Sequence, residues 1–148
     1  MVYKRSGNAI ILRPELGEDI VECLKRLMDE EGLLSASVVG IGGTSDAKIG
    51  LYDLEKKEYD FRQVNKFSEI TSIVGNLSRK NGEPYVHLHV TLFNEDGLTG
   101  GHLASATVSA TAEIYVTATD IKVEREAYEP LGLNHLAFED AKIVKIKK

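Results

Sequence analysis

Three of the four histidines lie in one segment, YVHLHVTLFNEDGLTGGHL, which spans residues 85–103. Neutral imidazoles are common ligands for zinc and similar divalent ions. His87 and His89 are two positions apart, and alternate residues of a strand face the same side of a sheet. The residues that alternate with these histidines are apolar, so we expect their side chains to pack against the core. The two imidazoles would then share the opposite face.

The third histidine follows a strong hairpin signal, Asn94–Gly97. If these four residues form the loop, counting back along both strands places His89 directly opposite His102. Directly opposed residues share a face, with Cβ atoms about 4.5–5.5 Å apart. A two-residue loop at Asp96-Gly97 would shift the pairing by two and keep this parity, whereas an odd loop or a bulge would turn His102 to the other face. An even loop therefore predicts that His87, His89 and His102 converge on one face of two neighbouring strands.

Three converging imidazoles can hold zinc or another divalent ion and leave the fourth tetrahedral position open for water or substrate, as in catalytic sites. The alternative is a packing or hydrogen-bonding role, which is common for an isolated histidine in a strand. The fourth histidine, His135, lies in a loop-like stretch far along the chain. We expect it to be structural or at the surface.

Two carboxylates in strand-like apolar surroundings, Glu113 and Glu69, are candidates for a general base acting on a metal-bound water. The alternative is that both are outward-facing acids on ordinary strands. Glu113 follows the histidine hairpin and ranks above Glu69. The glycine run Gly40–Gly43 precedes a strand-like segment rather than a helix, so we expect a tight turn there and not a phosphate-binding loop.

One strong helix is predicted over Glu18–Glu31, where apolar residues recur at helical spacing and Gly32 follows as the C-terminal cap. Turn-length connections join the remaining segments, which have strand character. The predicted fold class is α+β, a mainly antiparallel β-sheet with one principal α-helix packed on it, in a single domain over residues 1–148. The strand candidates are NAIILR, SASVVGIGG, AKIGLYD, KEYDFRQV, SEITSIVGNLS, the histidine strand, the segment from Leu98 to Val108, AEIYVTAT, and AKIVKIKK as an edge strand.

The composition limits the classes of protein to which this chain can belong. Its 148 residues, of which 43% are hydrophobic, are enough for the core of one domain. A single cysteine excludes an internal disulfide framework and fits a reducing compartment. The N-terminal sequence is not typical of a signal peptide and no run is apolar enough to span a membrane, so we expect a cytoplasmic protein. The net charge of −5 disfavours nucleic acid as a partner.

The segment GGHLASATVSATAEIYVTAT, residues 100–119, carries one charge in twenty residues. A strand without a charged face is usually buried on both sides. One helix can cover only one side of the predicted sheet, so we expect a neighbouring subunit to cover the other.

The histidine segment resembles the PPC (plant-and-prokaryote) domain family, as do VVGIGGTSDAKIGLYD, EYDFRQV and SEITSIVGNLS upstream of it, in the order and spacing of that family. The resemblance covers roughly residues 17–119, and the paired histidines with Gly-Gly-His are its most specific part. It implies a compact α+β domain that assembles as a homotrimer. It also implies metal binding, as in prokaryotic members, with His87, His89 and His102 as the ligands.

Plant members of the family join this domain to an AT-hook, an Arg-Gly-Arg-Pro element that enters the DNA minor groove, and this sequence contains no such element. Three functional hypotheses follow, in order of preference. The first is an oligomer that binds a divalent metal ion, with a regulatory or small-molecule-sensing role. The second is a metal-dependent hydrolase or lyase that uses the open coordination position, and the third is a DNA-binding protein by family analogy.

Overall fold

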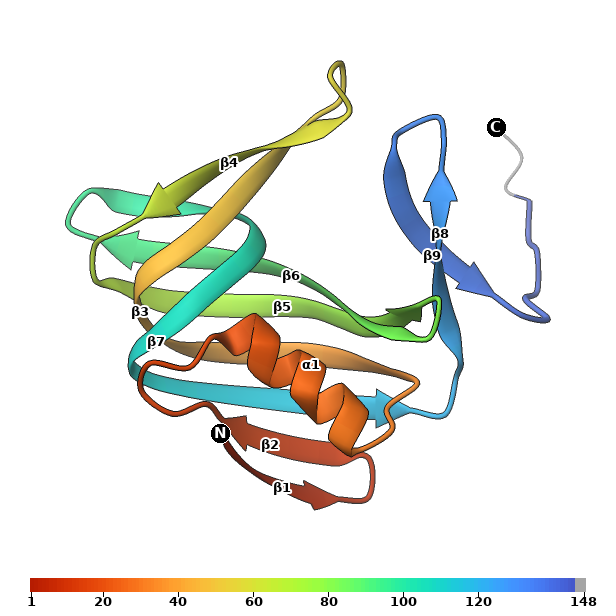
Figure 1. Ribbon diagram of the computed structural model, residues 1–148, viewed down its shortest axis with the longest axis horizontal. Coiled ribbons are helices and arrows are strands. Elements are labelled where there is room, and N and C mark those ends of the chain that lie inside the picture. The colour runs from red at the N-terminus through yellow and green to blue at the C-terminus, as the bar shows by residue number, and fades with distance from the viewer. Residues whose placement is uncertain (146–148) are drawn as a thin grey trace.

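The computed structural model describes residues 1–145, in which nine strands form one sheet and a single helix packs against it (Figure 1). Every strand pair is antiparallel except β5 with β8, so the predicted fold class is confirmed. The elements are β1 (Val2–Ser6), β2 (Ala9–Arg13), α1 (Ile20–Glu30), β3 (Ser35–Asp53), β4 (Glu58–Val64), β5 (Ser68–Lys80), β6 (Glu83–Asn94), β7 (Gly97–Thr119), β8 (Val123–Tyr128) and β9 (Leu133–Phe138).

Four strands close into a ring around the core, because β3 pairs with both β5 and β7, and β6 also pairs with both. The 23 residues of β7 make this closure possible. Its first part pairs with β6, and the rest runs along β3 and then β2. The sequence predicted two separate strands here, and the structure has one. The histidine hairpin is therefore part of the ring itself.

Helix α1 follows its sequence signals closely. Asp19 is the N-cap, and one of its carboxylate oxygens accepts a hydrogen bond from the backbone N–H of Glu22 at 3.0 Å. The other accepts from the backbone N–H of Ala106 in β7 at 2.8 Å, which ties the helix to the sheet. Beyond the helix, Gly32 takes the positive φ of 59° that the C-terminal turn requires. No helix in the part of the chain that the structure describes has the length and apolarity needed to cross a membrane.

The prediction of a tight turn at Gly40–Gly43 is wrong, because strand β3 continues through these residues, with a bulge between Gly40 and Gly42. A Cβ on Gly40 would lie 2.9 Å from the carbonyl oxygen of Glu113, and one on Gly42 would lie 2.6 Å from that of Thr111. The glycines allow β3 and β7 to approach closely without breaking the strand.

A row of apolar side chains crosses the outer face of the sheet. The strand register aligns Ile11 of β2, Tyr115 of β7, Val39 of β3, Val74 of β5 and finally His89 of β6. The four apolar members are 51%, 52%, 52% and 56% exposed. Within a single chain, β7 therefore buries only one of its two faces around Tyr115, whereas the sequence predicted that both faces are buried.

The C-terminal region differs most from the sequence predictions. The hairpin of β8 and β9 was not predicted, and neither was β1. The expected edge strand AKIVKIKK has no strand in residues 141–145, and its residues 146–148 lie outside the described part of the chain. The alternating pattern of this segment is not enough to form a strand where no partner strand lies beside it.

Candidate metal centre

The hairpin of β6 and β7 brings the three predicted histidines together. His89 lies directly opposite His102, and His87 precedes His89 by two positions on the same face of β6. The loop is Glu95–Asp96, two residues instead of the expected four, because Asn94 and Gly97 also pair; Phe93 still lies opposite Leu98. The predicted register and shared face are confirmed.

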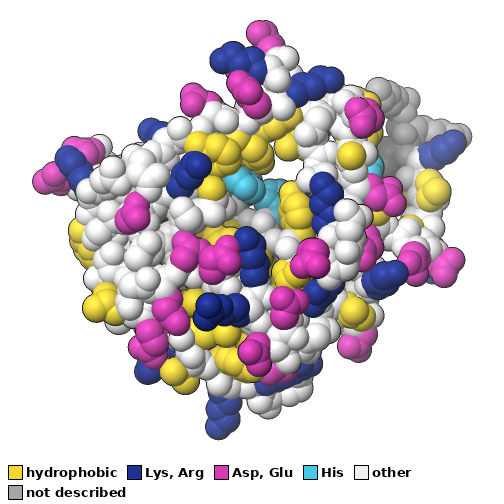
Figure 2. Space-filling view, viewed as in Figure 1, with side chains coloured by type: hydrophobic (Ala, Val, Ile, Leu, Met, Phe, Trp, Pro, Cys, Tyr) yellow, Lys and Arg dark blue, Asp and Glu magenta, His cyan; other side chains and the backbone are white. Residues whose placement is uncertain are grey.

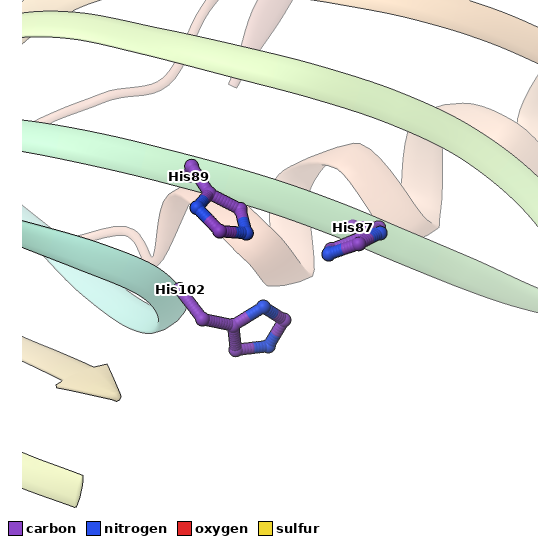
Figure 3. A group of neighbouring side chains, drawn as sticks. All are labelled: His87, His89 and His102. Carbon is purple, nitrogen blue, oxygen red and sulfur yellow. The ribbon is translucent and has the colours of Figure 1, made fainter. Parts of the chain in front are cut away.

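The three imidazoles converge from β6 and β7 on one space (Figure 3). One ligand nitrogen from each lies within 4.8 Å of the other two. The ring centroids are 5.4 Å apart for His87 and His89, 5.3 Å for His87 and His102, and 5.8 Å for His89 and His102. Among the described residues, this group holds imidazoles alone and no carboxylate or thiol.

Two glycines let the strands around the histidines approach closely. A Cβ on Gly75 of β5 would lie 2.0 Å from the carbonyl oxygen of His87. A Cβ on Gly101, whose φ is +153°, would lie 2.6 Å from the carbonyl oxygen of Gly50 in β3. No larger residue fits either position unless the backbone moves, so these glycines fix where His87 and His102 stand.

Partial burial favours the neutral form of His87 and His102, whereas the side chain of His89 is exposed. Burial is the main cause that lowers the pKa of His102 to about 4, followed by the charges of His87 and His89. Burial also lowers the pKa of His87, with smaller contributions from the guanidinium of Arg125 and from His89. Nδ1 of His102 is buried and has no hydrogen-bond partner in the described part of the chain. Neutral imidazoles with an unpartnered ring nitrogen fit the donor set of a divalent ion such as zinc.

An aromatic ladder on the β3–β4 hairpin supports the cluster from one side. The ring of Tyr59 stacks on His102 with centroids 4.6 Å apart. Tyr59 in turn contacts Tyr52 edge-on at 5.0 Å and stacks on Phe61 at 5.3 Å. The ladder excludes water from one face of His102 and restricts the orientations that its ring can take.

A buried arginine contacts the cluster at His87. Arg125 of β8 is only 6% exposed, and its Nη2 is 3.5 Å from Nδ1 of His87. Its guanidinium donates to Asn76 Oδ1 at 2.6 Å, to Ser78 Oγ at 3.0 Å and to the carbonyl oxygen of Asn134 at 3.1 Å. All of these acceptors are neutral.

The histidines form the floor of a hollow that is visible in Figure 2, with hydrophobic side chains around its rim.

The β3–β4 and β8–β9 hairpins, which lie beside the cluster, contact each other at their tips. The hydroxyl of Tyr52 donates to the carbonyl oxygen of Leu131, and Nζ of Lys57 donates to that of Glu129 at 3.3 Å. The β3–β4 and β8–β9 hairpins therefore brace each other beside the three imidazoles.

The two candidate bases lie elsewhere on the chain. Glu113 and Glu69 are exposed, and both line a depression that also includes Ile41 and Thr111 but none of the histidines. His135 is exposed on β9, where its ring stacks on Tyr128 at 5.1 Å, as expected for a surface residue.

Two neighbours of the cluster, Tyr59 and Arg125, were not identified from the sequence. The alternation of aromatic residues in EYDFRQV gave a signal for Tyr59, because Tyr59 and Phe61 share one face of a strand. No local pattern distinguishes Arg125 from the other basic residues, because its burial depends on contacts 47 and 49 residues away.

The sequence profile of the Plants and Prokaryotes Conserved (PCC) domain matches residues 1–120. This chain belongs to that family. The match confirms the resemblance drawn from the histidine motif and ends before β8, so Arg125 lies outside the matched segment. A comparison with curated protein sequences gave no match.

Several solved structures share the fold of this PCC-domain protein. A candidate DNA-binding protein from Bacteroides thetaiotaomicron is 32% identical, with a TM-score of 0.89 over 93% of this chain and 96% of its own. A metal-containing protein from Archaeoglobus fulgidus is 34% identical, with a TM-score of 0.83 over 93% and 99%. A plant- and prokaryote-conserved (PPC) protein from Pyrococcus horikoshii is 35% identical, with a TM-score of 0.81 over 96% and 97%.

Proposed function

We propose that this PCC-domain protein binds one divalent metal ion, zinc, through His87, His89 and His102. The observation that carries the proposal is the approach of one nitrogen from each imidazole to within 4.8 Å of the others. The lowered pKa values of His87 and His102 support it, since protonated imidazoles do not bind metal ions. The metal-containing neighbour from Archaeoglobus fulgidus, similar over nearly its whole length, supports it further.

Three protein ligands leave a tetrahedral ion one open position. The hollow above the histidines gives a small molecule a route to it. A ligand-sensing or regulatory role follows most directly, since the group contains no acid or thiol that would close the site as a structural zinc site.

The test is the metal content of protein purified without a histidine tag, measured by elemental analysis. We expect about one zinc per chain, and loss of that zinc in His89→Ala. The matched control is His135→Ala, which removes the exposed histidine outside the cluster and should keep the metal. Metal-free wild-type protein that stays metal-free after zinc is added back would overturn the proposal.

A metal-dependent hydrolase or lyase is the second candidate, because an ion at this open position would lower the pKa of a bound water. Glu113 and Glu69 remain the proposed bases. Within one chain the depression that they line contains no histidine, so either would act from a neighbouring subunit. Hydrolytic or lyase activity that is lost in His89→Ala and in Glu113→Gln or Glu69→Gln would support this candidate, and activity that survives both glutamine variants would remove these bases.

We also propose that the protein assembles as a homotrimer through the outer face of its sheet. The row Ile11, Tyr115, Val39 and Val74 exposes contiguous apolar surface, which is unusual for a monomer. The resemblance of the sequence to this family implied a homotrimer, and membership of the family supports the same assembly.

DNA binding has less support. The Bacteroides thetaiotaomicron neighbour bears that candidate name, but the net charge of −5 and the lack of an Arg-Gly-Arg-Pro element both disfavour it in this chain.

A further inference from the structure

Arg125 is the only charged residue among the buried side chains of the described chain. Burying a charge is unfavourable unless a partner of opposite charge compensates it. Its partners are an amide, a hydroxyl and a carbonyl, and its guanidinium also lies 4.9 Å from the ring centre of Tyr85. None of the ion pairs in the described residues includes Arg125. The guanidinium remains protonated in proteins, so its charge is uncompensated.

Arg79, a nearby arginine on β5, shows the usual arrangement. Its Nη1 pairs with the carboxylate of Asp29 at 3.1 Å, and its other N–H groups donate to the backbone oxygens of Leu33 and Met28. Arg79 is opposite Glu124, the residue before Arg125. The two arginines thus lie at the same junction of β5 and β8, and only the one beside the histidines lacks an anion.

A divalent ion on the three histidines would add two positive charges to the charge of Arg125. An imidazole that coordinates a metal ion is neutral, and no carboxylate belongs to this group. The ion and Arg125 together carry a charge of about +3, and with no carboxylate in the described histidine group the site favours a negatively charged ligand.

Metal binding also changes the contact between Arg125 and His87. Arg125 can only donate a hydrogen bond, so its contact with Nδ1 of His87 requires a free lone pair there. When a neutral imidazole binds an ion through one nitrogen, Nδ1 carries either the ion or the proton. In both cases Nδ1 can no longer accept, and one N–H of Nη2 becomes available for another acceptor beside the ion.

We propose that the open position of this metal site takes the carboxylate group of a small organic acid, and that Arg125 supplies the counter-charge that selects it. The inference rests on the proposed metal site and names the class of its ligand. A planar guanidinium matches a carboxylate in shape and charge. The aromatic ladder that ends at Tyr59 offers an apolar wall for the rest of a small acid.

The test uses the full chain loaded with Co²⁺, whose visible absorption reports a change at the open coordination position. Acetate is the probe, and acetamide, which has the same shape and no charge, is its control. The number of Co²⁺ ions bound per chain is measured separately, so failure of the metal site and failure of the anion proposal give different results. Acetate should change the spectrum in a saturable manner at constant ionic strength, and acetamide should not.

Two glutamine variants then separate charge from structure. Arg125→Gln should weaken acetate binding on the order of tenfold or more. The same variant should bind Co²⁺ as tightly as the wild type or more tightly, because a positive charge beside the ion has gone. A purely structural role for Arg125 would weaken both. Arg79→Gln, at the same strand junction but away from the histidines, should change neither affinity.

Arg125→Lys keeps the charge and should retain most of the acetate affinity, so it serves if Arg125→Gln loses its fold by circular dichroism. The proposal is overturned if the Co²⁺-loaded wild type does not distinguish acetate from acetamide, or if folded Arg125→Gln binds acetate as well as the wild type. If the wild type takes up no Co²⁺, the metal site itself is wrong and this inference falls with it.

Discussion

Tyr59 and His102 form a stacked pair that joins two distant parts of the chain, with ring centroids 4.6 Å apart and planes inclined by 29°. Tyr59 belongs to the β3–β4 hairpin and His102 to β7. The stack is possible because residue 50, which pairs with both His102 and Phe61, is a glycine. A Cβ on Gly50 would lie 2.8 Å from the Phe61 ring and 3.0 Å from that of Tyr59. The aromatic ladder and the histidine site therefore depend on the same local packing.

The first prediction concerns this stack. Tyr59→Ala should lower the affinity for zinc on the order of tenfold, since residues that orient a metal ligand typically contribute that much. Without the ring, His102 would be more hydrated and free to rotate. Tyr59→Phe keeps the stacked ring and should bind zinc as the wild type does. Competition with a chromophoric chelator measures both affinities, and equal affinities in the two variants would contradict the proposed role of the stack.

The second prediction concerns the stability of the metal-free protein at low pH. Burial lowers the pKa of His102 to about 4, whereas an imidazole in an unfolded chain has a pKa of about 6.5. Between these values the unfolded chain binds more protons, so the free energy of unfolding decreases as pH falls. The contribution of His102 is complete above about pH 6.5 and is lost progressively toward pH 4. His87, whose pKa is also lowered, adds to the same trend.

Thermal unfolding in the presence of a chelator should therefore show a falling midpoint between pH 7.5 and pH 5. His102→Leu removes one of the groups responsible and should reduce this fall. His135→Gln changes a histidine outside the cluster and should keep the wild-type pH dependence. A His102→Leu variant with the same pH dependence as the wild type would show that the buried imidazole does not contribute.

The histidine hairpin could be predicted because every step of the argument was local. The parity of His87 and His89, the even loop and the register that places His89 opposite His102 all follow from the nineteen residues 85–103. The helix was predictable for the same reason, since its apolar spacing and both of its caps lie within the segment itself.

The surroundings of the cluster could not be predicted, because they depend on contacts between distant segments. β8 joins β5 through the single register pair Arg79 and Glu124, so the position of β8 beside β5 depends on very little local pairing. Arg125 belongs there because Ser78 and Asn76 accept its hydrogen bonds, and neither residue is unusual in sequence. At the glycine run, in contrast, a clear local pattern led to a wrong prediction. Gly40–Gly43 was interpreted as a turn, whereas glycine in a strand also allows two backbones to approach closely.

The last prediction concerns assembly. Val39 lies in the middle of the exposed apolar row, between Tyr115 and Val74. If this face is covered in a homotrimer, Val39→Lys would bury an unpaired ammonium group at each interface, at a cost on the order of a few kcal/mol. Sedimentation at micromolar concentration should show a trimer for the wild type and smaller species for Val39→Lys. Leu51→Lys is the matched control, because Leu51 lies on the same strand, is 78% exposed and is outside the row.

Metal content provides a second measurement on the same samples. All three histidines come from one chain, so dissociated Val39→Lys should still bind about one zinc per chain. Its circular dichroism should match the wild type, because Val39 is half exposed and outside the core. A wild-type monomer, or a Val39→Lys protein that remains trimeric, would show that this face is not the interface. Loss of zinc from a folded, dissociated variant would instead show that a neighbouring subunit completes the metal site.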